Sequence, residues 1–182
     1  MAKILILFAH PAFEKSRVHS QLLTAIRGMQ GVTLHDLYEV YPDLNIDVRH
    51  EQSLLLQHDI ILFQHPFYWY SAPAMIKQWQ DLVLEHGWAY GRTGTALRGK
   101  MAGNVISAGA QESTYSKEGW HKYTIHDFLL PFRQTAMLCN MQYLEPFVIY
   151  GTHRLSYTGI LEQAVAYKKM LEGLRDGQAK IQ

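Results

Sequence analysis

Apolar and polar positions alternate in blocks along this chain, and the blocks predict buried β-strands separated by helices. Residues 4–8 and 59–64 are dominated by apolar runs, which parallel strands covered on both faces require. Shorter apolar stretches predict three further strands, at residues 32–37, 103–109 and within 141–150.

The segments between these strands carry apolar residues at spacings of three and four, the period of an amphipathic helix. In the first such segment, Val18, Leu22, Ile26 and Met29 share one face. Pro131 is expected to break or kink a later helix, because proline has no amide hydrogen to donate. The predicted helices cover residues 18–29, 49–57, 73–83, 127–138 and 160–174.

Strands that alternate with helices in this way are typical of a doubly wound α/β domain. No repeat, low-complexity stretch or linker divides the chain. We therefore expect one domain over residues 1–182, with a five-stranded parallel sheet and helices on both faces. The 48% hydrophobic and 18% charged residues agree with a single globular core.

Charge and cysteine content restrict the partners and the compartment. A formal net charge of +1 gives no electrostatic basis for a nucleic-acid partner. Cys139 is the only cysteine, so no intrachain disulfide is possible, and its apolar surroundings predict a buried, inert thiol. The N-terminal apolar run is too short for a membrane span or a secretory signal. These features predict a cytoplasmic protein.

Three predicted strands end in unusual loops, at residues 10–19, 65–71 and 107–121. Ligands of open parallel sheets bind beyond the carboxyl ends of the strands, so these loops should converge on one site. The first loop leads directly into a helix, whose N-terminus suits a phosphate. Ser16, His10, Arg17 and His19 could donate to that phosphate, or Ser16 could be only a helix cap and His10 only a strand-end residue.

The second and third loops suit a planar ligand. Four successive aromatic residues, Phe67 to Tyr70, follow Pro66 and offer stacking surfaces for an isoalloxazine ring, although some of these rings could cap the core. The small residues 107–110 allow a flat ligand to approach the backbone. Tyr115 and His121 follow and could hydrogen-bond a reduced flavin or an acceptor oxygen, although such a pair is often structural.

Together these loops resemble those of the NAD(P)H:quinone oxidoreductase family, the flavodoxin-like group that includes DT-diaphorase. The resemblance extends over almost the whole chain and is strongest to the bacterial Kef potassium-efflux ancillary flavoproteins. The segments that carry it are Phe8–Pro11, Tyr41–Asp47, Gln64–Ser71, His86–Gly91 and Gly94–Lys100. One departure is the third loop, which usually reads Thr-Thr-Gly-Gly, so that a hydroxyl contact at Ala108 would be lost.

The resemblance implies a flavodoxin-like fold, a bound flavin and two-electron transfer from NADPH or NADH to a quinone by a ping-pong scheme. FMN is the expected flavin because the chain is shorter than the diaphorases that hold FAD, although FAD remains open. Tyr115 and His121 match the pair that assists hydride transfer in the diaphorases. The implied cofactor contacts are His10, Ser16, Arg17, Val18, His19, Pro66, Phe67, Tyr68, Trp69, Tyr70, Ser107, Ala108, Gly109 and Ala110.

The resemblance also implies a homodimer and, as an alternative function, the binding and activation of a Kef-type potassium/proton antiporter at the inner face of the membrane. Two other enzyme classes fit less well. Residues 9–14 are similar to the start of zinc deacetylases, but Ala12 and Phe13 occupy the positions of the aspartates, so no metal site is predicted. The chain also lacks the Gly-x-Ser-x-Gly elbow of serine hydrolases.

Overall fold

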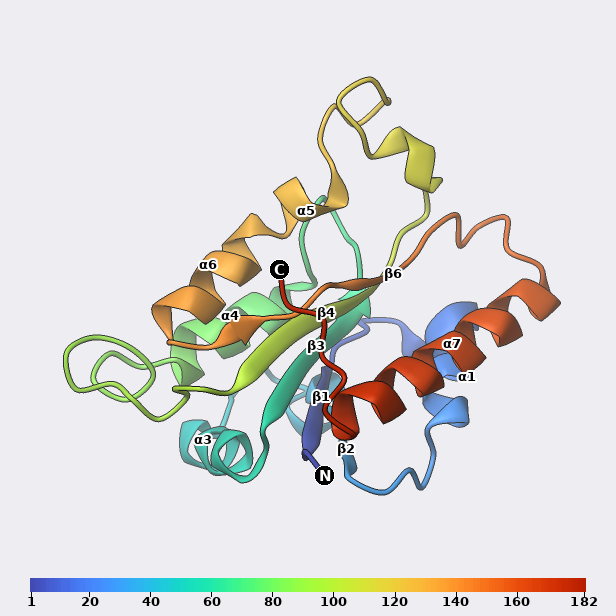
Figure 1. Ribbon diagram of the computed structural model, residues 1–182. Helices are drawn as coiled ribbons and strands as arrows, with labels where there is room; N and C mark the ends of the chain where they lie inside the picture. The colour runs from blue at the N-terminus through green and yellow to red at the C-terminus, as the bar shows by residue number, and fades with distance from the viewer.

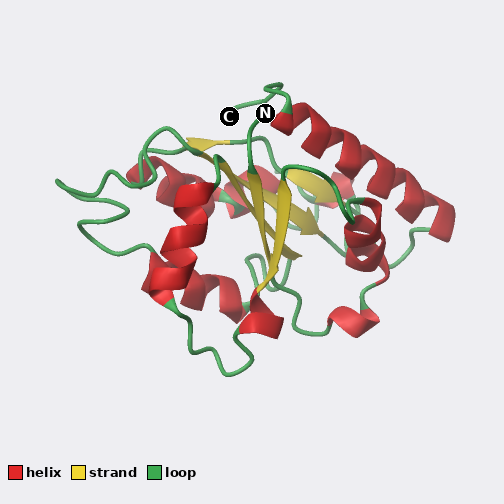
Figure 2. Ribbon diagram, turned by 90° about the horizontal axis from the view of Figure 1, so that it is seen from below, coloured by secondary structure: helices red, strands yellow, loops and turns green.

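The computed structural model describes residues 1–182 and contains one parallel sheet with helices on both sides (Figures 1 and 2). The strands lie in the order β2-β1-β3-β4-β5, and the short strand β6 also pairs with β4. This order is that of flavodoxin-like sheets, so the predicted fold class is confirmed. The strands are β1 (Ile4–Phe8), β2 (Val32–Asp36), β3 (Ile60–Pro66), β4 (Met101–Ser107), β5 (Gln142–Tyr143) and β6 (Phe147–Ile149).

The last expected strand, within residues 141–150, is divided into two short strands. β5 pairs with the start of β4 at Met101 and Ala102, whereas β6 pairs with its end at Val105–Ser107. Pro146 lies between the two and cannot donate a ladder hydrogen bond. The fifth position of the sheet is therefore filled by two segments rather than by one continuous strand.

The helices form a layer on each face of the sheet (Figure 2). α1 and α7 pack on one face, and α3, α4 and α6 cover the other (Figure 1). Pro131 lies in the first turn of α6, where its missing amide hydrogen costs nothing, and α5 ends just before it, as predicted. The helices are α1 (Arg17–Ala25), α2 (Leu37–Val40), α3 (Val48–Gln57), α4 (Ala74–Val83), α5 (Ile125–Phe128), α6 (Leu130–Leu138) and α7 (Tyr157–Arg175).

Helix α1 is shorter than the apolar spacing predicts. It ends at Ala25, although Ile26 still packs into the core. Gly28 has a φ of 73° and Gly31 a φ of 82°, which are left-handed conformations that end a helix. Residues 26–31 therefore form a turn that leads into β2, rather than the last turn of the helix.

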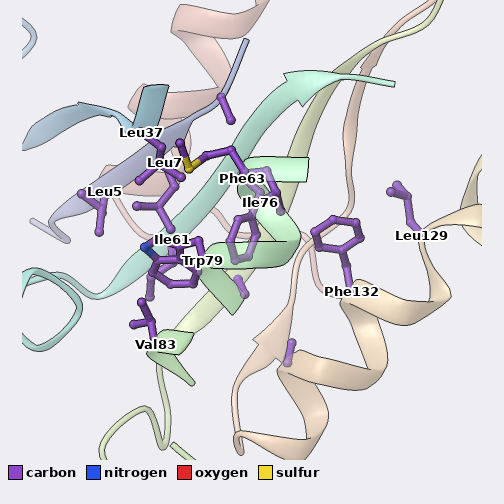
Figure 3. Close-up of a cluster of buried hydrophobic side chains, with 14 of the residues drawn as sticks. Leu5, Leu7, Leu37, Ile61, Phe63, Ile76, Trp79, Val83, Leu129 and Phe132 are labelled. Atoms are coloured by element: carbon purple, nitrogen blue, oxygen red, sulfur yellow. The ribbon is translucent and has the colours of Figure 1, made fainter. Parts of the chain in front are cut away.

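Alternate side chains of the strands divide the core into two clusters. Leu5, Leu7 and Ile61 point toward α3, α4 and α6, whereas Ile4 and Ile6 point toward α1 and α7. Figure 3 shows the first cluster, where the ring of Trp79 lies among aliphatic side chains of the strands and helices. Cys139 belongs to this cluster, and burial raises the pKa of its thiol, so the prediction of an inert cysteine agrees with the structure.

One carboxylate is enclosed in the first cluster. Glu51 of α3 is fully buried and accepts hydrogen bonds of 2.7 Å from His35 Nε2, the Tyr41 hydroxyl and Trp79 Nε1. Burial by itself would raise the pKa of Glu51, but the three donors outweigh it and hold that pKa below its ordinary value. His50 also lies near this carboxylate, but the three donors occupy the oxygens that a metal ion would need.

The register brings the carboxyl ends of the central strands together. Phe8 of β1 is level with Gln64 of β3, and Pro66 of β3 is level with Ser107 of β4. The loops that follow β1, β3 and β4 therefore leave the sheet at one edge. None of the helices has the length and apolar character needed to cross a bilayer.

Candidate functional site

A cleft of about 450 Å³ opens at this carboxyl edge of the sheet. The loops after β1, β3 and β4 all contribute to its walls, so the predicted convergence is confirmed. Its volume lies in the range of small-molecule and cofactor sites. The residues that line it are His10, Ala12, Lys15, Ser16, Arg17, Val18, Pro66, Phe67, Tyr68, Ser107, Gly109, Thr152 and His153.

The N-terminus of α1 forms one end of the cleft. The Ser16 side chain caps this helix by accepting a hydrogen bond of 3.1 Å from the His19 amide. The first amide groups of a helix lack partners within it and carry a partial positive charge. Lys15 and Arg17 add formal positive charge at the same place, and the Arg17 guanidinium also donates to the Leu155 carbonyl at 3.0 Å. This end of the cleft is suited to a phosphate.

His10 forms the floor beside this helix terminus. Its Nδ1 accepts a hydrogen bond of 3.2 Å from the Ala12 amide, which leaves the other ring nitrogen available. Burial lowers the pKa of His10, because the surroundings disfavour a charged imidazole, although Glu14 opposes that effect. His10 therefore presents a neutral ring to the cleft, so the positive charge at this end comes from Lys15, Arg17 and the helix.

The four aromatic side chains of the loop after β3 lie in different surroundings. Phe67 and Tyr68 line the cleft, and the Phe67 amide donates to the Ser107 carbonyl at 2.9 Å. Trp69 and Tyr70 adopt left-handed backbone conformations, with φ of 51° and 63°. Such conformations cost free energy and are concentrated at functional sites. Trp69 is 92% exposed and does not line the cleft.

The loop after β4 is fixed by hydrogen bonds to the loop after β6. The Ala108 carbonyl accepts from the Thr152 amide at 3.2 Å, and the Ala110 carbonyl accepts from the Gly151 amide at 2.8 Å. A Cβ at Gly109 would lie 2.5 Å from His153 Nε2, so only glycine fits beneath that ring. Ala108 is fully buried, and neither Ala108 nor Ala110 lines the cleft.

Tyr115 and His121 lie together beside the aromatic loop. Their rings are stacked, with centroids 4.4 Å apart and an interplanar angle of 19°. Phe67 joins them to the cleft, since its ring centroid is 6.0 Å from that of Tyr115. Burial, with a smaller contribution from Tyr70, raises the pKa of Tyr115, so its hydroxyl keeps its hydrogen and remains a donor.

The His121 imidazole carries the protein's only buried side-chain nitrogen or oxygen without a hydrogen-bond partner, Nδ1. Buried polar atoms are almost always paired in folded proteins, and an exception at a site requires an explanation. Tyr70 packs against the same ring at 5.5 Å and does not satisfy this nitrogen. This nitrogen has almost no accessible surface, and neither Tyr115 nor His121 lines the cleft, so the stacked pair lies behind its aromatic wall.

Not every residue that the sequence assigns to the cofactor lies on the surface of the cleft. His19 is only 1% exposed and lies behind Ser107 rather than in the cleft. Tyr70 lies outside the lining residues and stacks on Phe128, with centroids 5.1 Å apart. The first loop was predicted as a whole, but Ala12 and Lys15 within it were not singled out.

Thr152 and His153 line the cleft but were not predicted, because the sequence of the loop after the last strand carries no aromatic or glycine-rich pattern. They follow β6 directly, so the same rule that selects the other three loops would have found them. The sequence predicts one strand within residues 141–150 and does not show where it ends. The structure places that end at Ile149, the last residue of β6.

Comparisons with known proteins show the family to which the chain belongs. Residues 2–171 match the Flavodoxin_2 family, described as having a flavodoxin-like fold, and the chain belongs to that family. It is 44% identical over 170 residues to the glutathione-regulated potassium-efflux system ancillary protein KefG of Yersinia pseudotuberculosis, covering 93% of each chain.

Two solved structures are similar over nearly their whole length. General stress protein 14 of Treponema denticola, in complex with FMN, has a TM-score of 0.90 and 38% identity, covering 94% of this chain and 99% of that one. An NADPH-quinone reductase from P. pentosaceus has a TM-score of 0.84 and 34% identity, covering 92% of this chain and 96% of that one.

The residues present fit a flavin mononucleotide. The cationic helix terminus suits the phosphate, and Phe67 and Tyr68 offer faces against which a planar ring can lie. Gly109 presents no side chain where the third loop borders the cleft, so Ser107 supplies the only side chain of this loop there.

Proposed function

We propose that this protein is an FMN-dependent NAD(P)H:quinone oxidoreductase. The observation that carries the proposal is one cleft with a cationic helix terminus at one end and, beside its aromatic wall, a stacked Tyr115–His121 pair with an unpaired ring nitrogen. The similarity to an FMN complex and to an NADPH-quinone reductase supports it.

Bound FMN would supply the redox chemistry, in which a hydride from NAD(P)H and a proton convert the quinone to a hydroquinone and leave NAD(P)⁺. The protein positions the cofactor through Lys15, Ser16 and Arg17 at the phosphate end. Tyr115 donates a hydrogen bond from its protonated hydroxyl, which stabilises developing negative charge. His121, stacked on Tyr115, is the group proposed to accept or return the proton that accompanies the hydride.

The open cleft supports a ping-pong scheme, in which the nicotinamide leaves before the quinone enters the same space. Initial-rate plots at several fixed quinone concentrations are then parallel, and intersecting lines contradict the scheme.

The exposed rings of Trp69 and Trp120, which are 92% and 85% accessible, support a homodimer that covers them. Sedimentation analysis tests this, with W120S as the variant expected to weaken association.

The visible absorption spectrum of the purified protein is the direct test of the catalytic proposal. A yellow protein that loses its colour with anaerobic NADPH and regains it with quinone is the expected result. A protein that stays colourless and does not take up added FMN contradicts the proposal.

A second candidate function is activation of a Kef-type potassium/proton antiporter. The similarity to KefG over 93% of the chain favours it. Potassium efflux from cells that express the cognate antiporter should then rise when this protein is present. A Y115F/H121Q variant separates the two functions: efflux that persists without quinone reduction shows that docking alone is sufficient. An unchanged efflux with the wild-type protein contradicts this second function.

A further inference from the structure

Four polar side chains from four different elements form a hydrogen-bonded chain that ends at the cleft. The Tyr167 hydroxyl of α7 lies 2.6 Å from Gln64 Oε1 of β3. Gln64 Nε2 lies 3.2 Å from Nδ1 of His19 in α1, and His19 Nε2 lies 2.9 Å from the Ser107 hydroxyl at the end of β4. Tyr167, Gln64 and His19 are buried, and of the four only Ser107 lines the cleft.

Only one direction of the chain gives the buried Tyr167 hydroxyl hydrogen an acceptor. Tyr167 is fully buried, and Gln64 is its only hydrogen-bond partner, so its hydrogen must go to Gln64 Oε1. The distance of 2.6 Å also fits O–H···O better than N–H···O. This fixes the Gln64 amide, whose Nε2 then donates to His19 Nδ1. The imidazole hydrogen is consequently on Nε2, which donates to the Ser107 oxygen.

The buried imidazole stays neutral in this arrangement. Burial, with smaller contributions from His10 and His65, lowers the pKa of His19 to about 3. A neutral ring donates from one nitrogen and accepts at the other, as the direction of the chain requires. His19 therefore neither carries charge to the cleft nor exchanges protons there near neutral pH.

The Ser107 hydroxyl accepts from His19, and its own hydrogen has no acceptor in the protein. We infer that Tyr167, Gln64 and His19 are positioning residues that fix Ser107 as a hydrogen-bond donor into the cleft, where it selects an acceptor oxygen of the bound ligand. With respect to the ligand this inference rests on the proposed function, because FMN supplies that oxygen. The direction of the chain itself does not depend on any ligand.

Nuclear magnetic resonance of the ligand-free protein tests the direction. Two-bond ¹⁵N–¹H correlations distinguish the two imidazole tautomers, and a H19N variant assigns the signals. The expected result is a neutral Nε2–H ring for His19 from pH 5 to 8. An Nδ1–H tautomer or an imidazolium in this range overturns the inference, even if the protein never binds FMN.

Binding of FMN, measured by quenching of its fluorescence, tests the consequence. Loss of one hydrogen bond in S107A should weaken FMN binding about 3- to 10-fold. Y167F frees the Gln64 amide to rotate, so it should mix the His19 tautomers and weaken binding in the same direction. In the S107A background Y167F should have no further effect, because both changes remove the same donor. Equal losses from Y167F in both backgrounds overturn the inference.

Tyr143 supplies a matched control. It is also a buried tyrosine, and its hydroxyl donates to Asn104 at 2.6 Å rather than to Gln64. Y143F should lower stability as Y167F does, while the His19 tautomer and FMN affinity stay unchanged. If Y143F also shifts the tautomer, the effect of Y167F is a general loss of packing and the positioning role is overturned. If wild-type protein shows the Nε2–H tautomer but no FMN binding, only the proposed function fails.

Discussion

Single residues at the site combine packing with chemistry. Tyr115 belongs to the first core cluster, yet its ring is also one half of the stacked pair with His121. Ser16 also has two roles: it caps α1, which is the structural interpretation, and it lines the cleft. A residue with both roles is fixed by the fold before any ligand arrives, which reduces the entropic cost of binding.

Removing the Tyr115 hydroxyl or the His121 imidazole should slow turnover more than it weakens cofactor binding. Y115F and H121Q each lose one polar contact to a centre that develops charge, so kcat/KM for quinone should fall about 10- to 100-fold. Steady-state kinetics at saturating FMN measure this fall, and a separate FMN titration measures affinity. Y123F, a change at an exposed tyrosine that also packs on Phe128, is the control and should leave both values unchanged.

Gly151 fixes the third loop through its backbone. Its φ is 66°, and a Cβ there would lie 2.7 Å from Gln111 Nε2. G151A should therefore destabilise the protein by about 1–2 kcal/mol, because alanine is strained in this conformation. Urea unfolding measures the change. G173A is the control, since its Cβ would meet nothing closer than 3.4 Å and alanine favours a helix; a loss in G173A equal to that in G151A contradicts the argument.

Among the elements, the strands and the long helices were predicted well, because burial on both faces and helical periodicity leave clear patterns. The short α2 at Leu37–Val40 was missed because four residues carry no periodicity. It begins where Asp36 caps it by accepting from the Tyr38 amide at 3.1 Å. The early end of α1 was missed because Ile26 keeps the apolar spacing after the helix has stopped. In both cases a local cap, rather than the apolar pattern, decides the boundary.

Helix α3 is held against the sheet by the buried Glu51 carboxylate, and E51Q should destabilise the protein by about 2–4 kcal/mol. The glutamine amide nitrogen would face one of the donors from His35, Tyr41 or Trp79, so that donor loses its acceptor. Chemical denaturation measures the loss. E162Q on the exposed face of α7 is the control and should change stability by less than about 0.5 kcal/mol. Equal stability of E51Q and wild type contradicts the assigned network.

The molecule as a whole should lose stability on mild acidification. Burial lowers the pKa of His19 to about 3 and that of His65 to about 4, from an ordinary value of 6.5. Below pH 6.5 the unfolded chain therefore binds protons that the folded protein excludes. The stability that each neutral histidine contributes is fully present above pH 6.5. It is lost as the pH falls toward the pKa of that histidine in the folded protein, by up to about 1.4 kcal/mol per pH unit for each histidine.

Urea unfolding at pH 7, 6 and 5 checks this prediction. H19N should remove part of the slope, because His65 stays excluded from protonation and burial also lowers the pKa of His10. H126N, a change at a half-exposed histidine, should leave the slope as it is. A pH dependence that is the same in H19N and wild type contradicts the assignment. The lowered pKa of Glu51 adds a loss of the same sign below its ordinary value of 4.5.

For the whole molecule, the sequence was sufficient to predict which loops converge, because the carboxyl ends of parallel strands share an edge. It was not sufficient to predict which side chains within those loops reach the cleft. The outward turn of Trp69 depends on two left-handed residues, and the burial of His19 depends on Gln64 and Ser107 from distant strands. Such placements arise from contacts between elements, which a single sequence does not display.

Residues 180–182 lie along the outer edge of β5. The Glu145 amide donates to the Lys180 carbonyl at 2.9 Å, and the Gln182 amide donates to the Tyr143 carbonyl at 3.0 Å. An uncovered strand edge is a template for pairing with other chains, and proteins protect such edges to avoid aggregation. Deleting residues 178–182 should therefore leave the cleft unchanged but make the protein self-associate through its sheet edge. This short C-terminal segment then keeps the protein soluble by covering the sheet edge, without taking part in the cleft.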